Sequence, residues 1–132
     1  MDLSIDQVRA CKDAALISNK CIIALAKQKI FDSFYLRSFK QCDDLCAAFL
    51  HAASTDSIYL EKIALLCVGL CEECVEICED LKNKKLFKEA LSVFQNCSNL
   101  LSTENLYKSA TYKHWKELKT KAVTKNGNCF IL

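Results

Sequence analysis

The hydrophobic residues of this chain recur with the period of amphipathic α-helices, and short polar stretches interrupt them. Ser4 is a suitable N-cap for the first helix, and the polar run from Ser54 to Ser57 suits a turn before the third. The four predicted helices cover residues 4–30, 33–53, 58–81 and 86–101. Because helices of similar length with short connections pack as antiparallel neighbours, the pattern predicts an antiparallel four-helix bundle over residues 1–102.

The predicted first helix carries an apolar stripe that should face the core. Its members are Ile5, Val8, Cys11, Ala15, Ser18, Ile22 and Leu25. The whole chain has no proline and only two glycines, so few positions favour a sharp turn and an all-α protein is expected. Gly69, one of these glycines, either permits a close approach between helices or is a tolerated surface residue of the third helix.

The C-terminal part of the chain differs in character from the bundle. After a Thr103 cap, a weaker apolar stripe and many lysines predict a basic C-terminal helix over residues 103–125. Residues 126–132 are expected to form a short flexible tail. Since 132 residues suit one domain, we expect a single core with an appended helix.

Charge and targeting signals exclude several classes of protein. Eighteen Lys and Arg against sixteen Asp and Glu give a net charge of +2, so no nucleic-acid binding is expected. The N-terminal residues lack the basic and apolar regions of a signal peptide, and we expect a cytoplasmic protein. In a reducing compartment the ten cysteines should be free thiols, metal ligands or redox groups rather than structural disulfides.

Four cysteines lie within the thirteen-residue stretch LCVGLCEECVEIC of the predicted third helix. At about 100° per residue, they fall within an arc of roughly 60° on one helical face. They are Cys67, Cys71, Cys74 and Cys78. The acidic residues of this stretch occupy the opposite face, so the thiols should point into the bundle.

Two interpretations of this stripe stay open. Buried cysteine can serve as a small core residue, although leucine or isoleucine would bury more area and resist oxidation. Alternatively, residues four apart on a helix have Cβ atoms about 5–6 Å apart, so that two thiolates can bind one soft ion such as Cu(I). Zinc ranks second, because its sites usually combine short loops with histidines, and His51 and His114 lie far from the stripe in sequence. Iron–sulfur clusters also favour loop-borne cysteines.

A second pair with the same spacing, Cys42 and Cys46, occurs in the stretch CDDLC of the predicted second helix. The stretches CDDLC and CEECVEIC, on successive helices, resemble those of the cysteine-rich four-helix-bundle copper storage proteins. The resemblance extends from about Cys11 to Leu101. It implies that cysteines of all four helices line the bundle and bind several Cu(I) ions, and that the protein sequesters copper rather than catalysing a reaction.

The resemblance adds Cys11, Cys21 and Cys97 to the expected copper ligands. Cys11 and Cys21 lie about 80° apart around the predicted first helix, so they do not form an obvious pair. The second helix departs from the family pattern, because other residues take positions where sulfur would be expected. They are Tyr35, Phe39, Phe49 and Ala53. We therefore expect a reduced metal capacity, concentrated between the paired cysteines of the second and third helices; a bundle that has lost storage also fits.

The last four residues, CFIL, match the C-a-a-X pattern for prenylation of Cys129, and a final leucine favours geranylgeranyl. Five lysines between Lys113 and Lys125 are opposed only by Glu117. A basic patch beside one lipid favours binding to an anionic membrane surface. The alternative is a solvated lysine face followed by a frayed end.

Two functions follow from these observations. The first is Cu(I) storage or detoxification by a cytoplasmic bundle; the second is a non-catalytic interaction or effector protein that a prenylated Cys129 anchors to membranes. Either is compatible with a homo-oligomer. An enzyme is not expected, because a bundle wall does not bring a cysteine and a histidine together beside an oxyanion donor.

Overall fold

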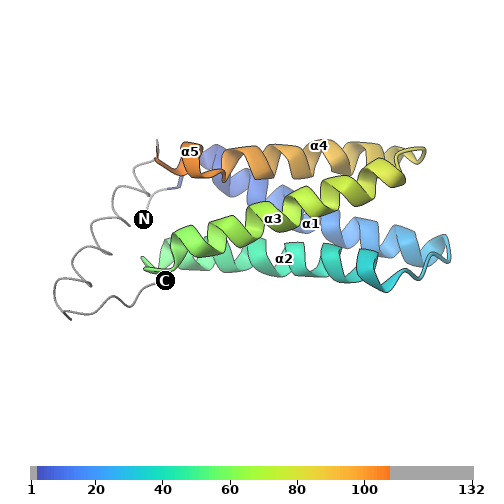
Figure 1. Cartoon of the computed structure of the whole chain (residues 1–132), viewed down its shortest axis with the longest axis horizontal. Helices are drawn as coiled ribbons and strands as arrows, with labels where there is room; N and C mark the ends of the chain where they lie inside the picture. The colour runs from blue at the N-terminus through green and yellow to red at the C-terminus, as the bar shows by residue number, and fades with distance from the viewer. Residues whose placement is uncertain (1–2, 108–132) are drawn as a thin grey trace.

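The computed structural model describes residues 3–107, which form five α-helices (Figure 1). The helices are α1 (Ile5–Lys27), α2 (Ser33–Ser54), α3 (Leu60–Asp80), α4 (Lys85–Leu100) and α5 (Thr103–Tyr107). The all-α prediction is confirmed, and the ends of the first four helices differ from the predicted ones by no more than three residues. α5 begins where the basic helix was expected, and the remainder of residues 103–125 and the tail 126–132 lie outside the described residues.

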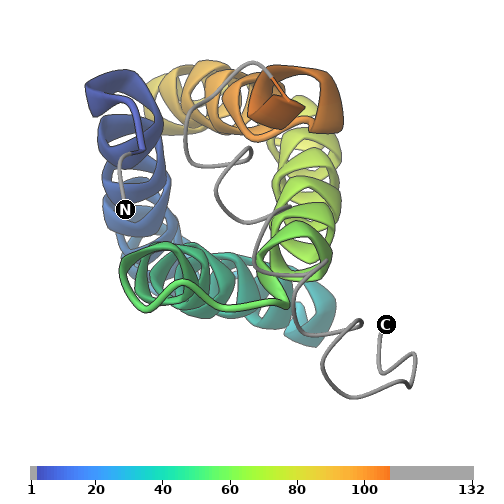
Figure 2. The ribbon, with the colours of Figure 1, turned by 90° about the vertical axis from the view of Figure 1, so that its left-hand side faces the viewer.

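The four long helices run antiparallel around a common axis. Figure 2, which looks along the bundle, shows α1, α2, α3 and α4 at the corners of a square. α1 packs against α2 and α4, and α3 packs against the same two helices. The short α5 lies at the end of the bundle where α1 begins and contacts α3 and α4 (Figure 1). Its Leu106 is buried and joins the common core.

Side chains cap the starts of α1 and α2. Ser4 and Gln7 form a capping box, in which each side chain accepts a hydrogen bond from the other residue's backbone N–H at 3.1 Å. The amide of Gln7 also donates to the carbonyl of Leu100 at 3.2 Å, which connects the start of α1 to the end of α4. At α2, the carboxylate of Asp32 accepts from two backbone N–H groups of the first turn.

The first two helices both end in Schellman-type turns without glycine. After α1 the N–H of Ile30 donates to the carbonyl of Leu25, and Lys29 occupies the left-handed region with φ 58°. After α2 the N–H of Ser57 donates to the carbonyl of Ala52, and Asp56 has φ 55°. The described helices therefore reverse direction without either glycine of the chain.

The buried face of α1 differs from the predicted stripe. The buried residues are Gln7, Ala10, Cys11, Ala14, Ile17, Ser18, Cys21 and Leu25. Ile5 is 75% exposed and Val8 is only half-buried, so the prediction for these two positions was wrong. The reason is that the helix is rotated so that Ala10, Ala14 and Ile17 enter the core, a rotation that hydrophobicity alone does not specify.

Aromatic side chains fill parts of the interior that cysteines leave free. Phe39, Phe49 and Phe87 are fully buried, and Phe94 of α4 stacks on Phe39 of α2 with ring centroids 5.9 Å apart. Phe39, Phe49 and Ala53 thus occupy the interior of α2 as expected, and Tyr35 is half-buried. The interior therefore combines a large apolar core with the thiols.

Gly69 is an exposed residue of α3, and a Cβ atom at this position would meet nothing within 4 Å. The surface interpretation of Gly69 is confirmed, and the close approach is excluded.

We expect Gly69→Ala to raise the free energy of unfolding by about 0.5–1 kcal/mol, because alanine loses less backbone entropy in a helix. Urea unfolding of the reduced protein measures this change. Ala47→Gly, at an exposed position of α2, is the matched control and should lower stability by a similar amount; a loss of stability in Gly69→Ala would contradict the prediction.

Between residues 3 and 107, no helix is both long enough and apolar enough to cross a bilayer.

Candidate metal centre

Nine cysteines of the described residues are free thiols, and every one is fully buried. α1 contributes Cys11 and Cys21, α2 contributes Cys42 and Cys46, α3 contributes Cys67, Cys71, Cys74 and Cys78, and α4 contributes Cys97. The predicted inward orientation of the α3 stripe agrees with this burial. All four long helices therefore present sulfur to the interior of the bundle.

Antiparallel packing of α2 and α3 brings their cysteine pairs together. The Sγ atoms of Cys46 and Cys67 are 3.6 Å apart, and those of Cys42 and Cys71 are 3.7 Å apart. A step of four residues backwards along α2 is matched by a step of four residues forwards along α3. Because both helices repeat cysteine at that interval, one register aligns two cross-helix pairs.

Four thiols gather more closely than the rest. The Sγ atoms of this quartet all lie within 4.8 Å of one another: Cys46, Cys67, Cys71 and Cys97. One member comes from α2, two from α3 and one from α4. The thiol of Cys11, from α1, interacts with those of Cys46 and Cys97. At this level of the bundle every long helix supplies at least one thiol.

The remaining thiols extend the cluster toward the other end of the bundle. Cys42 connects the two parts, because its Sγ atom lies 3.7 Å from that of Cys71 of the quartet and its thiol also interacts with that of Cys74. The thiol of Cys21 of α1 interacts with that of Cys78 of α3. The thiol of Cys74 also donates to the backbone carbonyl of Ser38 at 3.6 Å. The nine thiols thus form one continuous row inside the bundle.

The neighbours of most thiols disfavour ionisation. Hydrogen bonding to another cysteine is the largest cause, and burial adds to it, because a thiol that donates loses this bond when it ionises. Both effects raise the pKa of Cys11, Cys21, Cys67, Cys71 and Cys74 above the usual value of a thiol. These groups hold their protons at neutral pH until a metal ion displaces them.

Two members of the quartet have the opposite tendency. Interaction with neighbouring thiols, that of Cys11 first, lowers the pKa of Cys46 and of Cys97 below the usual value, against the effect of burial. A thiolate at either position accepts hydrogen bonds from surrounding S–H groups.

Between residues 3 and 107, cysteine thiols are the only buried side chains that can ionise. The buried polar side chains of this range are Gln7, Ser18 and Ser38, and none carries a charge. The hydroxyl of Ser18 donates to the carbonyl of Ala14 at 2.7 Å and is satisfied within its own helix. His51 is exposed. A metal ion inside the bundle would therefore meet thiolates alone, which are ligands for soft ions.

The structure brings together more thiols than the sequence paired. Cys11 and Cys21 do not meet, as expected, but each joins a different part of the row. Cys97 was expected as a ligand from the family resemblance, with no partner assigned, and it completes the quartet. The carbonyl of Ser38 was not anticipated as a thiol partner, and no sequence signal marks it. Cys129 and the basic stretch Lys113–Lys125 lie outside the described residues.

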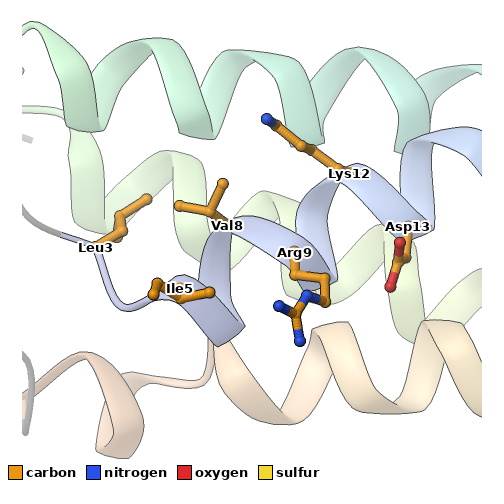
Figure 3. A pocket seen from close by; sticks show the side chains of 6 residues that line it. All are labelled: Leu3, Ile5, Val8, Arg9, Lys12 and Asp13. Atoms are coloured by element: carbon orange, nitrogen blue, oxygen red, sulfur yellow. The ribbon is translucent and has the colours of Figure 1, made fainter.

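A shallow surface hollow of about 390 Å³ lies at the start of α1. Figure 3 shows the six side chains around it, which are Leu3, Ile5, Val8, Arg9, Lys12 and Asp13. Its lining combines apolar side chains with charged side chains of both signs. No cysteine lines it, so the thiol row and this hollow are distinct features.

Comparison with known proteins relates the chain to other cysteine-rich proteins. Residues 2–104 match the protein family described as "Copper storage protein". The chain is also similar to the "Uncharacterized cysteine-rich protein YhjQ" of Bacillus subtilis (strain 168), with 30% identity over 73 residues, or 54% of this chain and 68% of the relative. No solved structure matches the chain significantly. Since the family match covers the whole bundle and all nine of its buried thiols, this chain belongs to the copper storage protein family.

Proposed function

We propose that the chain binds several Cu(I) ions through the thiolates inside its bundle and sequesters them. The observation that carries this proposal is the continuous row of nine fully buried thiols, to which all four long helices contribute. Membership of the copper storage protein family supports copper as the ion.

The chemistry of the row favours a soft monovalent ion. Sulfur is the only ligand atom that ionisable side chains offer inside the described bundle, and soft thiolates select Cu(I). Two-coordinate Cu(I) needs only two thiolates, which the cross-helix pairs at 3.6 Å and 3.7 Å supply. Burial of a net charge in an apolar core costs free energy. A thiolate that bridges two Cu(I) ions is shared between them, so bridging lowers the excess negative charge of the site.

Burial also explains why the arrangement suits storage rather than catalysis. Each thiol is screened from water, so a bound ion is inaccessible to a substrate. Nine thiols shared two to an ion would hold about four Cu(I) ions, and bridging sulfurs would raise this number. The interior aromatics limit the row, because Phe39 and Phe49 occupy positions on the same face of α2 as Cys42 and Cys46.

Titration of the reduced chain with Cu(I) under anaerobic conditions, against a competing chelator, tests the proposal. We expect about four or more ions per chain, counted by native mass spectrometry. The same protein with its thiols alkylated after unfolding is the control and should retain no copper. Retention of less than one ion per chain by the reduced protein would contradict sequestration.

Membrane attachment through Cys129 stays a prediction from the sequence. Expression of the chain in a eukaryotic cell, followed by fractionation, tests it against Cys129→Ser. Prenylation predicts that the unsubstituted chain moves to membranes and the variant does not. Equal distributions would count against the anchor and leave the copper proposal unaffected.

A further inference from the structure

We propose that the quartet of Cys46, Cys67, Cys71 and Cys97 is a tetrathiolate site for one Zn(II) ion, which the chain binds when Cu(I) is absent. This inference goes beyond copper sequestration and does not rest on it. It concerns a divalent ion, and it places this ion at one position in the row, the quartet.

The distances within the quartet suit a tetrahedral zinc site. Four atoms that all lie within 4.8 Å of one another leave a position no more than about 2.9 Å from each, and Zn–S bonds measure about 2.3 Å. A regular ZnS₄ tetrahedron with such bonds has sulfurs about 3.8 Å apart, and Cys46 and Cys67 are already 3.6 Å apart. Sub-ångström shifts of the side chains therefore complete the site.

The backbone arrangement favours a closed, four-coordinate site. The ligands come from three helices, and the two on α3 are four residues apart on one helical face. Structural zinc sites use four protein ligands and leave no open position. Zinc sites are commonly built on loops, whereas here the rigid walls of the bundle supply the same number of thiolates.

Binding exchanges protons for zinc without transfer of electrons. Four thiols lose four protons, and Zn²⁺ with four thiolates leaves a local charge of −2. The described interior contains no basic side chain to offset this charge. Two further thiols offset it in part: Cys11 interacts with Cys46 and Cys97, and Cys42 lies 3.7 Å from Cys71, so both can donate S–H hydrogen bonds to bound thiolates.

The rest of the row is unsuited to a second zinc ion. Within residues 3–107, the quartet is the single group of three or more Cys, His, Asp or Glu ligand atoms that lie this close together. Cys21, Cys74 and Cys78 are equally buried but lie outside it. We therefore expect one zinc ion per chain, and we expect Cu(I) to displace it because thiolates prefer the softer ion.

Titration of the full, reduced chain with Co(II), a spectroscopic substitute for Zn(II), tests the site. One equivalent should produce the visible ligand-field bands of tetrahedral cobalt thiolate, and one equivalent of Zn(II) should abolish them. Cys97→Ala should lower the affinity for Co(II) by on the order of 100-fold or more, because it removes a direct ligand. Cys78→Ala, an equally buried thiol outside the quartet, is the matched control and should keep one equivalent.

The outcomes distinguish this inference from copper storage. Circular dichroism of the metal-free variants establishes that both fold, and Cys129→Ser excludes a contribution from the C-terminal thiol if its cobalt spectrum is unchanged. Absence of tetrahedral bands, a stoichiometry other than one, or an unchanged affinity in Cys97→Ala would overturn the zinc site. A chain that binds one cobalt ion but retains no Cu(I) would overturn storage alone, and the converse would overturn the zinc site alone.

Discussion

Cys71→Ala is expected to remove more bound copper than alanine at any other described thiol. Cys71 lies at the centre of the row, where its Sγ atom is 3.7 Å from that of Cys42 and within 4.8 Å of the three other sulfurs of the quartet. Its loss therefore interrupts both the quartet and the link to the second half of the row. We expect at least one fewer Cu(I) ion per chain. We also expect the affinity for Cu(I) at the quartet to fall by more than roughly 10–100-fold, which is the loss that removal of an outer-sphere partner causes.

Chelator competition with native mass spectrometry measures both changes in the Cys71→Ala variant. Cys21→Ala is the matched control, because Cys21 is equally buried but lies outside the quartet. The control should lose less copper. Equal losses in the two variants would show that the ions bind to independent pairs, and they would contradict a central role for Cys71.

The second large effect concerns stability. Phe94→Ala is expected to lower the free energy of unfolding by about 3–5 kcal/mol, the usual cost of removing a buried phenylalanine. Phe94 is fully buried and stacks on Phe39 at 5.9 Å, so the substitution removes both core volume and an aromatic pair. Because natural domains are stable by about 5–15 kcal/mol, this loss would leave the metal-free protein close to unfolding.

Urea unfolding of the reduced, metal-free protein is the suitable measurement for Phe94→Ala. Metal must be absent because an ion that binds only the folded state adds to the apparent stability. Phe34→Ala provides a comparison at a side chain that is 44% exposed, and its effect should be much smaller. A loss of less than about 1 kcal/mol in Phe94→Ala would place the stabilising core elsewhere.

The interior of the bundle has two uses, apolar packing and metal binding. α2 alternates between them, with Phe39 and Phe49 on either side of Cys42 and Cys46. Phenylalanine buries much more apolar area than cysteine and so stabilises the bundle without metal. Each position that holds an aromatic ring in place of a cysteine has one metal ligand fewer. The same rings stabilise the bundle without metal, so the protein can combine a limited capacity for copper with a stable metal-free state.

Local patterns were sufficient to predict the helices and one wall of the site. A helix repeats every 3.6 residues, so the spacing of Cys67, Cys71, Cys74 and Cys78 alone placed them on one inward face. The same argument paired Cys42 with Cys46. It was less accurate for α1, where Ile5 is exposed, because hydrophobicity does not fix the rotation of a helix that has small residues on its interior face.

The sequence by itself determined the all-α fold, the antiparallel order of the helices and the inward thiols of α2 and α3. These features depend on periodicity and on short connections, which act between residues close in the chain. Only the tertiary structure decided that Cys97 of α4 completes a quartet with Cys46, Cys67 and Cys71, and that Cys11 adjoins it. Contacts between helices depend on their relative rotation and axial register. Packing of the whole core sets both, so no local spacing encodes them.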